Sequence, residues 1–146
     1  MQENLISRFK PAFTPKEMLK LGVFGGWYFE GNHQEFPKDW FTEAKLSKNG
    51  PDISLNCFGV DSGQSREVWQ KKGWITPEDP LGWFQWYCRF SLGRRIENVD
   101  NFQIGRWLQF GPRHLGGIKK NCEPGNFKCR PRQRQALLHW AYDPFI

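Results

Sequence analysis

Four large aromatic side chains constrain what this chain can fold into more than any other feature of its sequence. Their spacing of i, i+3, i+4 and i+7 places them on one face of an α-helix: Trp83, Trp86, Tyr87 and Phe90. We expect a helix from about residue 80 to residue 92, with Asp79 as its N-cap and Gly93 at its end. Because the apolar face of this helix is entirely aromatic, we predict that it forms the core.

The composition is that of one domain with an aromatic-rich core. The chain of 146 residues contains eight Trp and thirteen Phe, and its mean hydropathy is −0.70. A few large side chains must therefore supply the core among many polar ones. We predict a mainly α single domain of about six short helices with little or no sheet. The globular domain is expected to cover residues 14–146, after an irregular N-terminal arm at residues 1–13.

Local signals predict further elements in the first half of the chain. Thr14 and Glu17 form a capping box, which predicts a helix that begins at Pro15 and stops at Gly22. Three more elements follow from the apolar spacing, namely short helices over residues 36–46 and 65–72 and an extended segment over residues 53–60.

The sequence of the second half predicts two longer helices. Asn98 or Asp100 can cap the first of these, and the Gly111-Pro112 pair should end it. A separate short helical piece is expected over residues 113–120, and a final helix over residues 130–142.

Positive charge is concentrated in the second half. The net charge is +6, yet residues 1–84 hold ten Lys and Arg against eleven Asp and Glu, whereas residues 85–146 hold eleven against four. Most of these cations are arginines, whose planar guanidinium can grip a phosphate with two hydrogen bonds and stack on a base. Nucleic acid, DNA or RNA, is therefore the partner that best suits this half.

Three arginines at the start of the last expected helix are the clearest pointer to a functional surface. Arg130, Arg132 and Arg134 oppose the positive end of the helix dipole unless an anion binds there. We expect them to share a phosphate-binding face with the arginines of the central helix, with exposed aromatic rings for stacking. The predicted nucleic-acid-binding residues are Arg89, Arg94, Arg95, Arg113, Lys119, Lys120, Arg130, Arg132, Gln133 and Arg134.

The cysteines of the second half leave several states open. Cys122 and Cys129 flank a Pro-Gly turn, so their sulfur atoms can meet. Two free thiols are the preferred interpretation because the sequence shows no secretion signal, and a disulfide and a zinc site are the alternatives. A zinc site would use His114, Cys122, Cys129 and His139, although no CxxC or HxxxH pair is present. No other cofactor is expected.

The function predicted from the residues is nucleic-acid binding. One alternative is an enzyme that acts on a nucleotide or nucleic acid and clamps its phosphate with the arginines; a deep cleft lined by Trp, Arg and His would favour it. The other is a protein-interaction module for an acidic partner. No catalytic residue can be assigned. No apolar run reaches the roughly eighteen residues of a membrane span, so we expect an intracellular protein of the cytoplasm or nucleus without a membrane partner.

Several motifs of this chain also occur together in a known set of proteins. They are GWFQWYCRFSLGRR at residues 82–95, Arg106-Trp107, Arg113-His114, Asn121-Cys122, and CRPRQRQALLHWAYD at residues 129–143. With these motifs, residues 14–143 resemble an uncharacterised family of tryptophan-rich hypothetical proteins from cellular and viral genomes. The family has no established activity, so the resemblance implies no function and no catalytic residue.

Overall fold

The computed structural model describes residues 5–62 and 66–146, and no β-strand occurs within them. Its α-helices are α1 (Pro15–Leu21), α2 (Arg66–Lys71), α3 (Trp83–Ser91), α4 (Glu97–Asn121) and α5 (Pro131–His139). Four short 3₁₀ turns accompany them, at Ile6–Arg8, Phe24–Gly26, Lys38–Trp40 and Ile53–Leu55. The prediction of a mainly α fold around an aromatic-rich core is confirmed.

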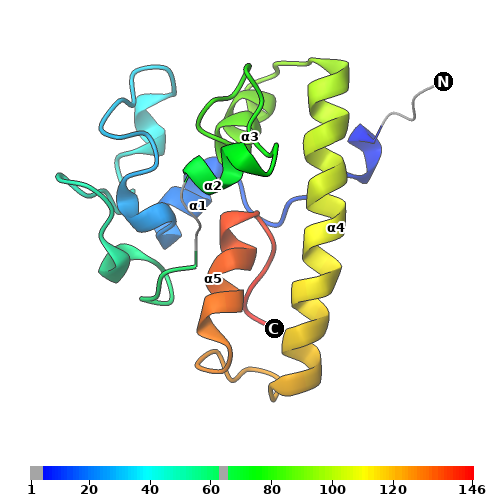
Figure 1. Cartoon of the computed structure of the whole chain (residues 1–146). Helices are drawn as coiled ribbons and strands as arrows, with labels where there is room; N and C mark the ends of the chain where they lie inside the picture. The colour runs from blue at the N-terminus through cyan, green and yellow to red at the C-terminus, as the bar shows by residue number, and fades with distance from the viewer. Residues whose placement is uncertain (1–4, 63–65) are drawn as a thin grey trace.

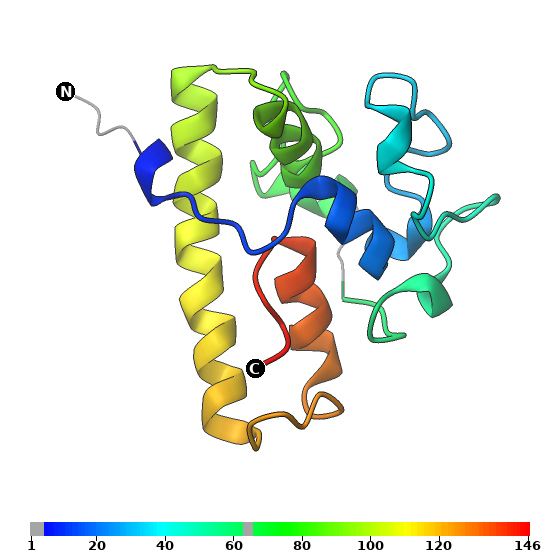
Figure 2. The same ribbon diagram turned by 180° about the vertical axis from the view of Figure 1, so that it is seen from behind.

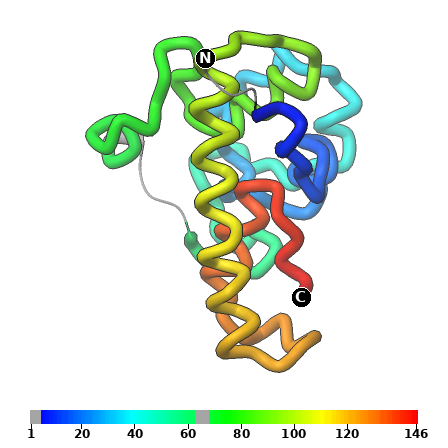
Figure 3. Tube along the Cα trace, turned by 90° about the vertical axis from the view of Figure 1, so that its right-hand side faces the viewer, coloured from blue at the N-terminus to red at the C-terminus, as the bar shows by residue number. Residues whose placement is uncertain are grey.

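Helix α4 is the long axis of the molecule. In Figure 1 it runs along one side, α3 lies beside its first half, and α5 runs antiparallel to its second half. The N-terminal half of the chain covers the far side of α3 and α5. Figure 3 shows the turn between α4 and α5 projecting beyond the rest of the fold.

The aromatic face of α3 is the centre of the core, as predicted. Each of its four side chains is at most 8% exposed: Trp83, Trp86, Tyr87 and Phe90. The N-terminal arm adds a fifth ring, because residues 5–13 cross α4 on their way to α1 (Figure 2). Phe9 from this arm lies with its ring centroid 4.9–6.2 Å from those four rings and from Trp107 of α4. The arm therefore packs as part of the core.

The start of α3 differs from the prediction. The helix begins at Trp83 with Gly82 as its N-cap, and Asp79 lies outside it. Asp79 is fully buried and accepts hydrogen bonds from Arg89 at 3.0 Å and from Arg94 at 2.8 and 2.6 Å. Two guanidinium groups hold this carboxylate more strongly than the free N–H groups of a helix end would. The expected end is confirmed, since Gly93 has a φ of 105° just after the helix.

Helix α4 continues through Gly111 and Pro112, where the sequence predicted an end. The reason lies in the C-terminal segment. The ring of Tyr142 occupies the place of a Cβ at Gly111, only 2.0 Å from where that atom would be. Its hydroxyl donates to the carbonyl of Trp107 at 2.5 Å, and its ring stacks on the Trp107 ring. These contacts stabilise α4 beside Pro112, which removes the helical hydrogen bond to the carbonyl of Leu108, and the piece expected at residues 113–120 belongs to α4.

Other local predictions have mixed outcomes. Helix α1 and its capping box are confirmed, and so is the helix expected at residues 65–72 as far as it is described, because residue 65 lies outside the described residues. The helix expected at residues 36–46 is only the turn Lys38–Trp40, and the extended segment at 53–60 starts with the turn Ile53–Leu55. The last helix ends at His139, three residues early. In these segments contacts with the core outweigh the local pattern; Phe36, for example, is buried in the core and packs on Phe29 at 5.0 Å.

Cys122 and Cys129 form a disulfide, so the preferred interpretation of two free thiols is wrong. Cys122 directly follows α4 and Cys129 lies two residues before α5. Because the two helices run antiparallel, the short turn between them brings the sulfur atoms together. In the described part of the chain, none of the helices is both long enough and apolar enough to cross a membrane.

Replacing Asp79 by alanine should destabilise the fold by about 3–5 kcal/mol, because Arg89 and Arg94 would lose their shared buried carboxylate. Urea unfolding of the variant measures the loss. The matched control is Asp39→Ala, which breaks the exposed pair with Lys16 and should cost less than about 1 kcal/mol. Equal losses in the two variants would contradict the importance assigned to the buried cluster.

Reducing the Cys122–Cys129 disulfide should lower the free energy of unfolding by about 2–3 kcal/mol, because the open loop has more conformational freedom in the unfolded chain. Thermal unfolding with and without a dithiol reductant measures this change. The control is the Cys122→Ser/Cys129→Ser double variant, whose melting temperature should not respond to the reductant. A wild-type melting temperature that is indifferent to reduction would count against the disulfide.

Candidate functional site

The arginines near α3 are occupied by contacts within the protein. Arg89 binds both oxygens of Glu35 at 2.6 and 2.7 Å, in addition to Asp79. Arg94 binds Asp79 through two nitrogens. Arg95 lies over the ring of Phe90 at 3.7 Å. Arg89 and Arg94 are therefore neutralised by carboxylates, and Arg95 is held by a ring.

Arg134 also has a structural role. Its side chain is completely buried and donates to the backbone carbonyls of Asn126, Cys129, Pro144 and Ile146. These bonds tie the turn between α4 and α5 to the C-terminal segment. The conflict between an arginine and the dipole of α5 is thus resolved by carbonyl acceptors, without a bound anion at this position.

The remaining predicted residues fall into two groups. Lys119, Lys120 and Arg130 are exposed around the turn between α4 and α5. Arg113, Arg132 and Gln133 line a pocket. The arginines at 94–95 precede α4 and those at 130–134 follow it, so they are separated by the length of a helix of 25 residues, roughly 37 Å. The structure does not bring the two predicted arginine groups onto one face.

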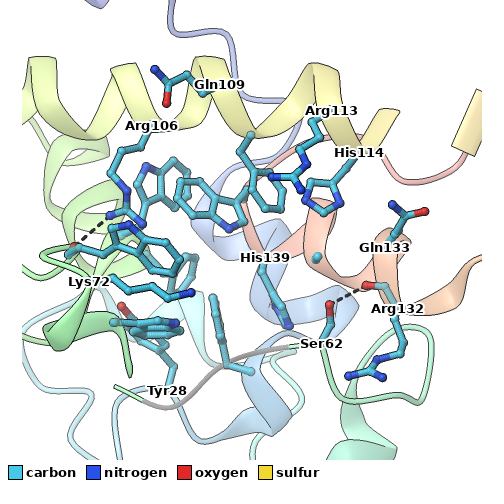
Figure 4. Close-up of a pocket in the computed structure, with 18 residues that line it drawn as sticks. Tyr28, Ser62, Lys72, Arg106, Gln109, Arg113, His114, Arg132, Gln133 and His139 are labelled. Carbon is cyan, nitrogen blue, oxygen red and sulfur yellow. Dashed lines mark hydrogen bonds between the residues drawn. The ribbon is translucent and has the colours of Figure 1, made fainter. Parts of the chain in front are cut away.

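The pocket lies between α4, α5 and the segment that follows α2, and has a volume of about 710 Å³ (Figure 4). Much of its wall is aromatic, including Tyr28, Trp69, Trp74, Trp83, Phe110 and Trp140. Four cationic side chains also line it, namely Lys72, Arg106, Arg113 and Arg132. None of the described lining residues is an Asp or Glu. The lining therefore combines positive charge with flat aromatic rings.

Arg106 is a partly buried cation whose contacts are with carbonyl groups and aromatic rings. Its Nη1 donates to the carbonyl of Trp74 at 2.9 Å and to Gln103 at 3.1 Å, and its guanidinium lies 5.1 Å from the Trp140 ring centroid. Burial lowers its pKa to about 10. Among the described residues it forms no ion pair with a carboxylate. A partly buried cation without a counter-charge favours an anionic ligand.

Two histidines and a glutamine add polar groups to the same pocket. His139 stacks on Phe24 at 4.2 Å, and burial lowers its pKa to about 3 against an opposing effect of Asp61. His114 stacks on Phe110, and burial together with Arg113 lowers its pKa. In the described structure, three buried atoms of this wall lack a hydrogen-bond partner: His114 Nδ1, Gln133 Oε1 and His139 Nδ1.

The zinc site considered from the sequence loses two of its four residues, because Cys122 and Cys129 are joined in the disulfide. His114 and His139 both line the pocket, where they stack on Phe110 and Phe24 respectively. Within residues 5–62 and 66–146, no group of three or more His, Cys, Asp and Glu side chains is arranged to hold a metal ion.

Sequence reasoning missed several residues of the pocket, above all Arg106 as a site residue. Arg106, Gln109, Phe110 and Arg113 follow the spacing i, i+3, i+4 and i+7, so they form one stripe of a helix. This signal is present in the sequence. The helix was expected to end at Gly111-Pro112, and this end separated Arg113 from the other three residues. The stripe was therefore not predicted.

Comparison with known proteins adds no relative: no protein-family model, curated protein or solved structure matches the chain. The resemblance to tryptophan-rich proteins stays a prediction. The function of the pocket therefore has to follow from its own residues.

Lowering the pH should decrease the free energy of unfolding, because His139 is buried in its neutral form. The side chain stays neutral in the folded protein down to about pH 3, whereas in the unfolded chain it takes up a proton below its ordinary pKa of 6.5. Its contribution to stability is therefore complete above pH 6.5 and falls as the pH drops towards 3. The resulting loss between neutral pH and about pH 5 is about 2 kcal/mol.

Denaturant unfolding of the wild type and of His139→Phe at several pH values measures this loss. The variant keeps a ring beside Phe24 but cannot titrate, so its stability should fall less in acid. His114 titrates in both proteins and cancels in the comparison. Parallel pH profiles for the two proteins would show that His139 takes up its proton as readily in the folded state as in the unfolded chain.

Proposed function

We propose that this protein binds a nucleotide unit, either free or as part of a nucleic acid, in the aromatic and basic pocket. Lys72, Arg106, Arg113 and Arg132 bind phosphate, and the aromatic wall takes the base. The proposal keeps the nucleic-acid partner inferred from the sequence. It moves the contact from an open arginine face to a pocket.

The observation that carries the proposal is Arg106, a guanidinium partly buried among rings without a carboxylate partner in the described chain. Its Nη1 donates to Trp74 and Gln103, whereas within residues 5–62 and 66–146 Nη2 and Nε form no hydrogen bond and can serve a ligand. A phosphate would supply the missing counter-charge through charge-assisted hydrogen bonds. Such bonds are strongest where water is largely excluded.

The aromatic wall supports a base as the other half of the ligand. The rings of Phe110 and Trp140 are already stacked on each other and packed on His114 and Trp83. The base would therefore meet Trp69 and Trp74, which also line the pocket. Stacking on such rings contributes about 1–3 kcal/mol per base in proteins that bind single strands. Phosphate and base recognition in one place is typical of nucleotide-binding sites.

An enzyme that acts on the bound nucleotide is the second candidate. The observation that favours it is His114, which lines the pocket beside Arg113 and whose lowered pKa keeps the imidazole neutral near pH 7, as a general base must be. Incubation of nucleotides and oligonucleotides with the wild type and with His114→Gln tests it. Turnover that the variant loses would support catalysis, and intact ligands in both samples would leave binding alone.

Arg106→Gln should weaken the binding of a single-stranded hexanucleotide roughly 10- to 100-fold, because charged hydrogen bonds to phosphate are lost. Titration followed by the quenching of tryptophan fluorescence measures the affinity, at about 50 and 200 mM salt. The matched controls, Arg95→Gln and Lys120→Gln, remove the same charge outside the pocket.

These controls separate the pocket from an open basic face. If the pocket binds the ligand, the two controls should keep nearly wild-type affinity. Equal losses in all three variants would point to a diffuse basic surface and contradict the proposed site. Undetectable binding by the wild type even at low salt would contradict the function itself.

A further inference from the structure

The four cations of the pocket lie toward two opposite ends. Arg106 and Lys72 lie over the same ring, with 5.2 Å and 4.7 Å from their charged groups to the Trp74 centroid. Arg113 of α4 and Arg132 of α5 line the other end, where Arg132 Nε donates to the carbonyl of Asp61 at 3.2 Å. Figure 4 shows Arg106 and Lys72 on one side of the pocket and Arg113 and Arg132 on the other.

Helix α4 fixes the separation of the two ends. Arg106 and Arg113 are seven residues apart in the unbroken helix, so they share one face and their backbones are about 10 Å apart along the axis. Both side chains are long enough to converge on a ligand shorter than this distance. Phe110, four residues after Arg106 on the same helix, lies between the two arginines and also lines the pocket.

A free nucleotide fits this arrangement only in part. The phosphates of a nucleoside 5′-phosphate are joined to one side of the sugar, so they reach the cations at one end only. A nucleotide within a strand carries one phosphate on each side of its sugar. Such a nucleotide provides an anion for both ends and a base for the rings between them.

The base must also be unpaired. The ring surface lies inside a pocket bounded by α4 and α5, with Trp83 of α3 among its lining residues, and a base that is stacked and paired in a duplex presents no free face to such a surface. An unpaired base in a single strand meets it without the cost of leaving a stack.

We propose that the pocket binds one unpaired nucleotide within a single strand, with one flanking phosphate held by Arg106 and Lys72 at one end and the other by Arg113 and Arg132 at the opposite end. This inference rests on the proposed function and specifies its ligand. The strand enters at one end of the pocket, its base stacks on the tryptophans of the pocket wall, and it leaves at the other end.

The sharpest probes are small nucleotides that differ only in their phosphates. A nucleoside 3′,5′-bisphosphate should bind at least roughly tenfold more tightly than either monophosphate of the same nucleoside, because it fills both cationic ends. A single-stranded hexanucleotide should bind more tightly than a hairpin duplex of the same composition.

Variants at the two ends assign the phosphates. In Arg106→Gln the bisphosphate should bind no better than one of the two monophosphates, and in Arg113→Gln no better than the other one. Lys72→Gln should repeat the first effect and Arg132→Gln the second, which keeps the test valid if either α4 variant fails to fold. For the hexanucleotide, each lost phosphate contact should reduce the slope of log affinity against log salt by about 0.7.

The outcomes separate this inference from the function on which it rests. If the bisphosphate and a monophosphate bind equally, or the duplex binds as tightly as the single strand, the two-ended site is wrong while nucleotide binding stands. If neither the small nucleotides nor the hexanucleotide binds, both proposals fail. Lys120→Gln serves as the control and should leave all these affinities unchanged.

Discussion

The burial of one aromatic helix face supports nearly everything else in this structure. Trp83, Trp86, Tyr87 and Phe90 of α3 bring the N-terminal arm, α4 and the C-terminal segment onto a common surface. Trp83 contributes twice, because it packs against Phe9 on the core side and against Trp140 on the pocket side. The stacked rings beside the cations therefore rest on the core, and they need no separate scaffold.

Several arginines of the second half have a structural role. Arg89 and Arg94 surround the buried Asp79, and Arg134 holds four backbone carbonyls. A positive net charge concentrated in half of a chain thus says little about which residues meet a ligand. Arg106 differs from Arg134 because, within the described structure, only its Nη1 is hydrogen-bonded, while it lies partly buried against rings without a carboxylate partner. Unpaired charge in a partly apolar place is the stronger criterion.

The pocket depends on a contact far from it in the sequence. Tyr142 packs against Gly111 and donates to the carbonyl of Trp107, which keeps α4 helical across Pro112. Without this support the turns that carry Arg106 and Arg113 would not share one axis. The disulfide at the far end of α4 fixes the return of the chain into α5, which brings Arg132 and Gln133 to the opposite wall.

Much of the fold class was predictable from the sequence. The aromatic spacing around Trp86 and the capping box at Thr14 each encode a helix within a few residues, so local physics was sufficient. Of the site, Arg113, Arg132 and Gln133 were predicted and do line the pocket.

The rest required the tertiary structure. Whether an arginine meets a carboxylate, a carbonyl or an open pocket depends on partners distant in the chain, as Glu35 and Asp79 are from Arg89. The continuity of α4 was decided in the same way, because the ring that compensates for Pro112 comes from Tyr142. The sequence by itself determined the helices and their aromatic core, through interactions between residues three and four apart. Only the tertiary structure decided which charges remain available to a ligand, since neutralisation and burial are properties of long-range contacts.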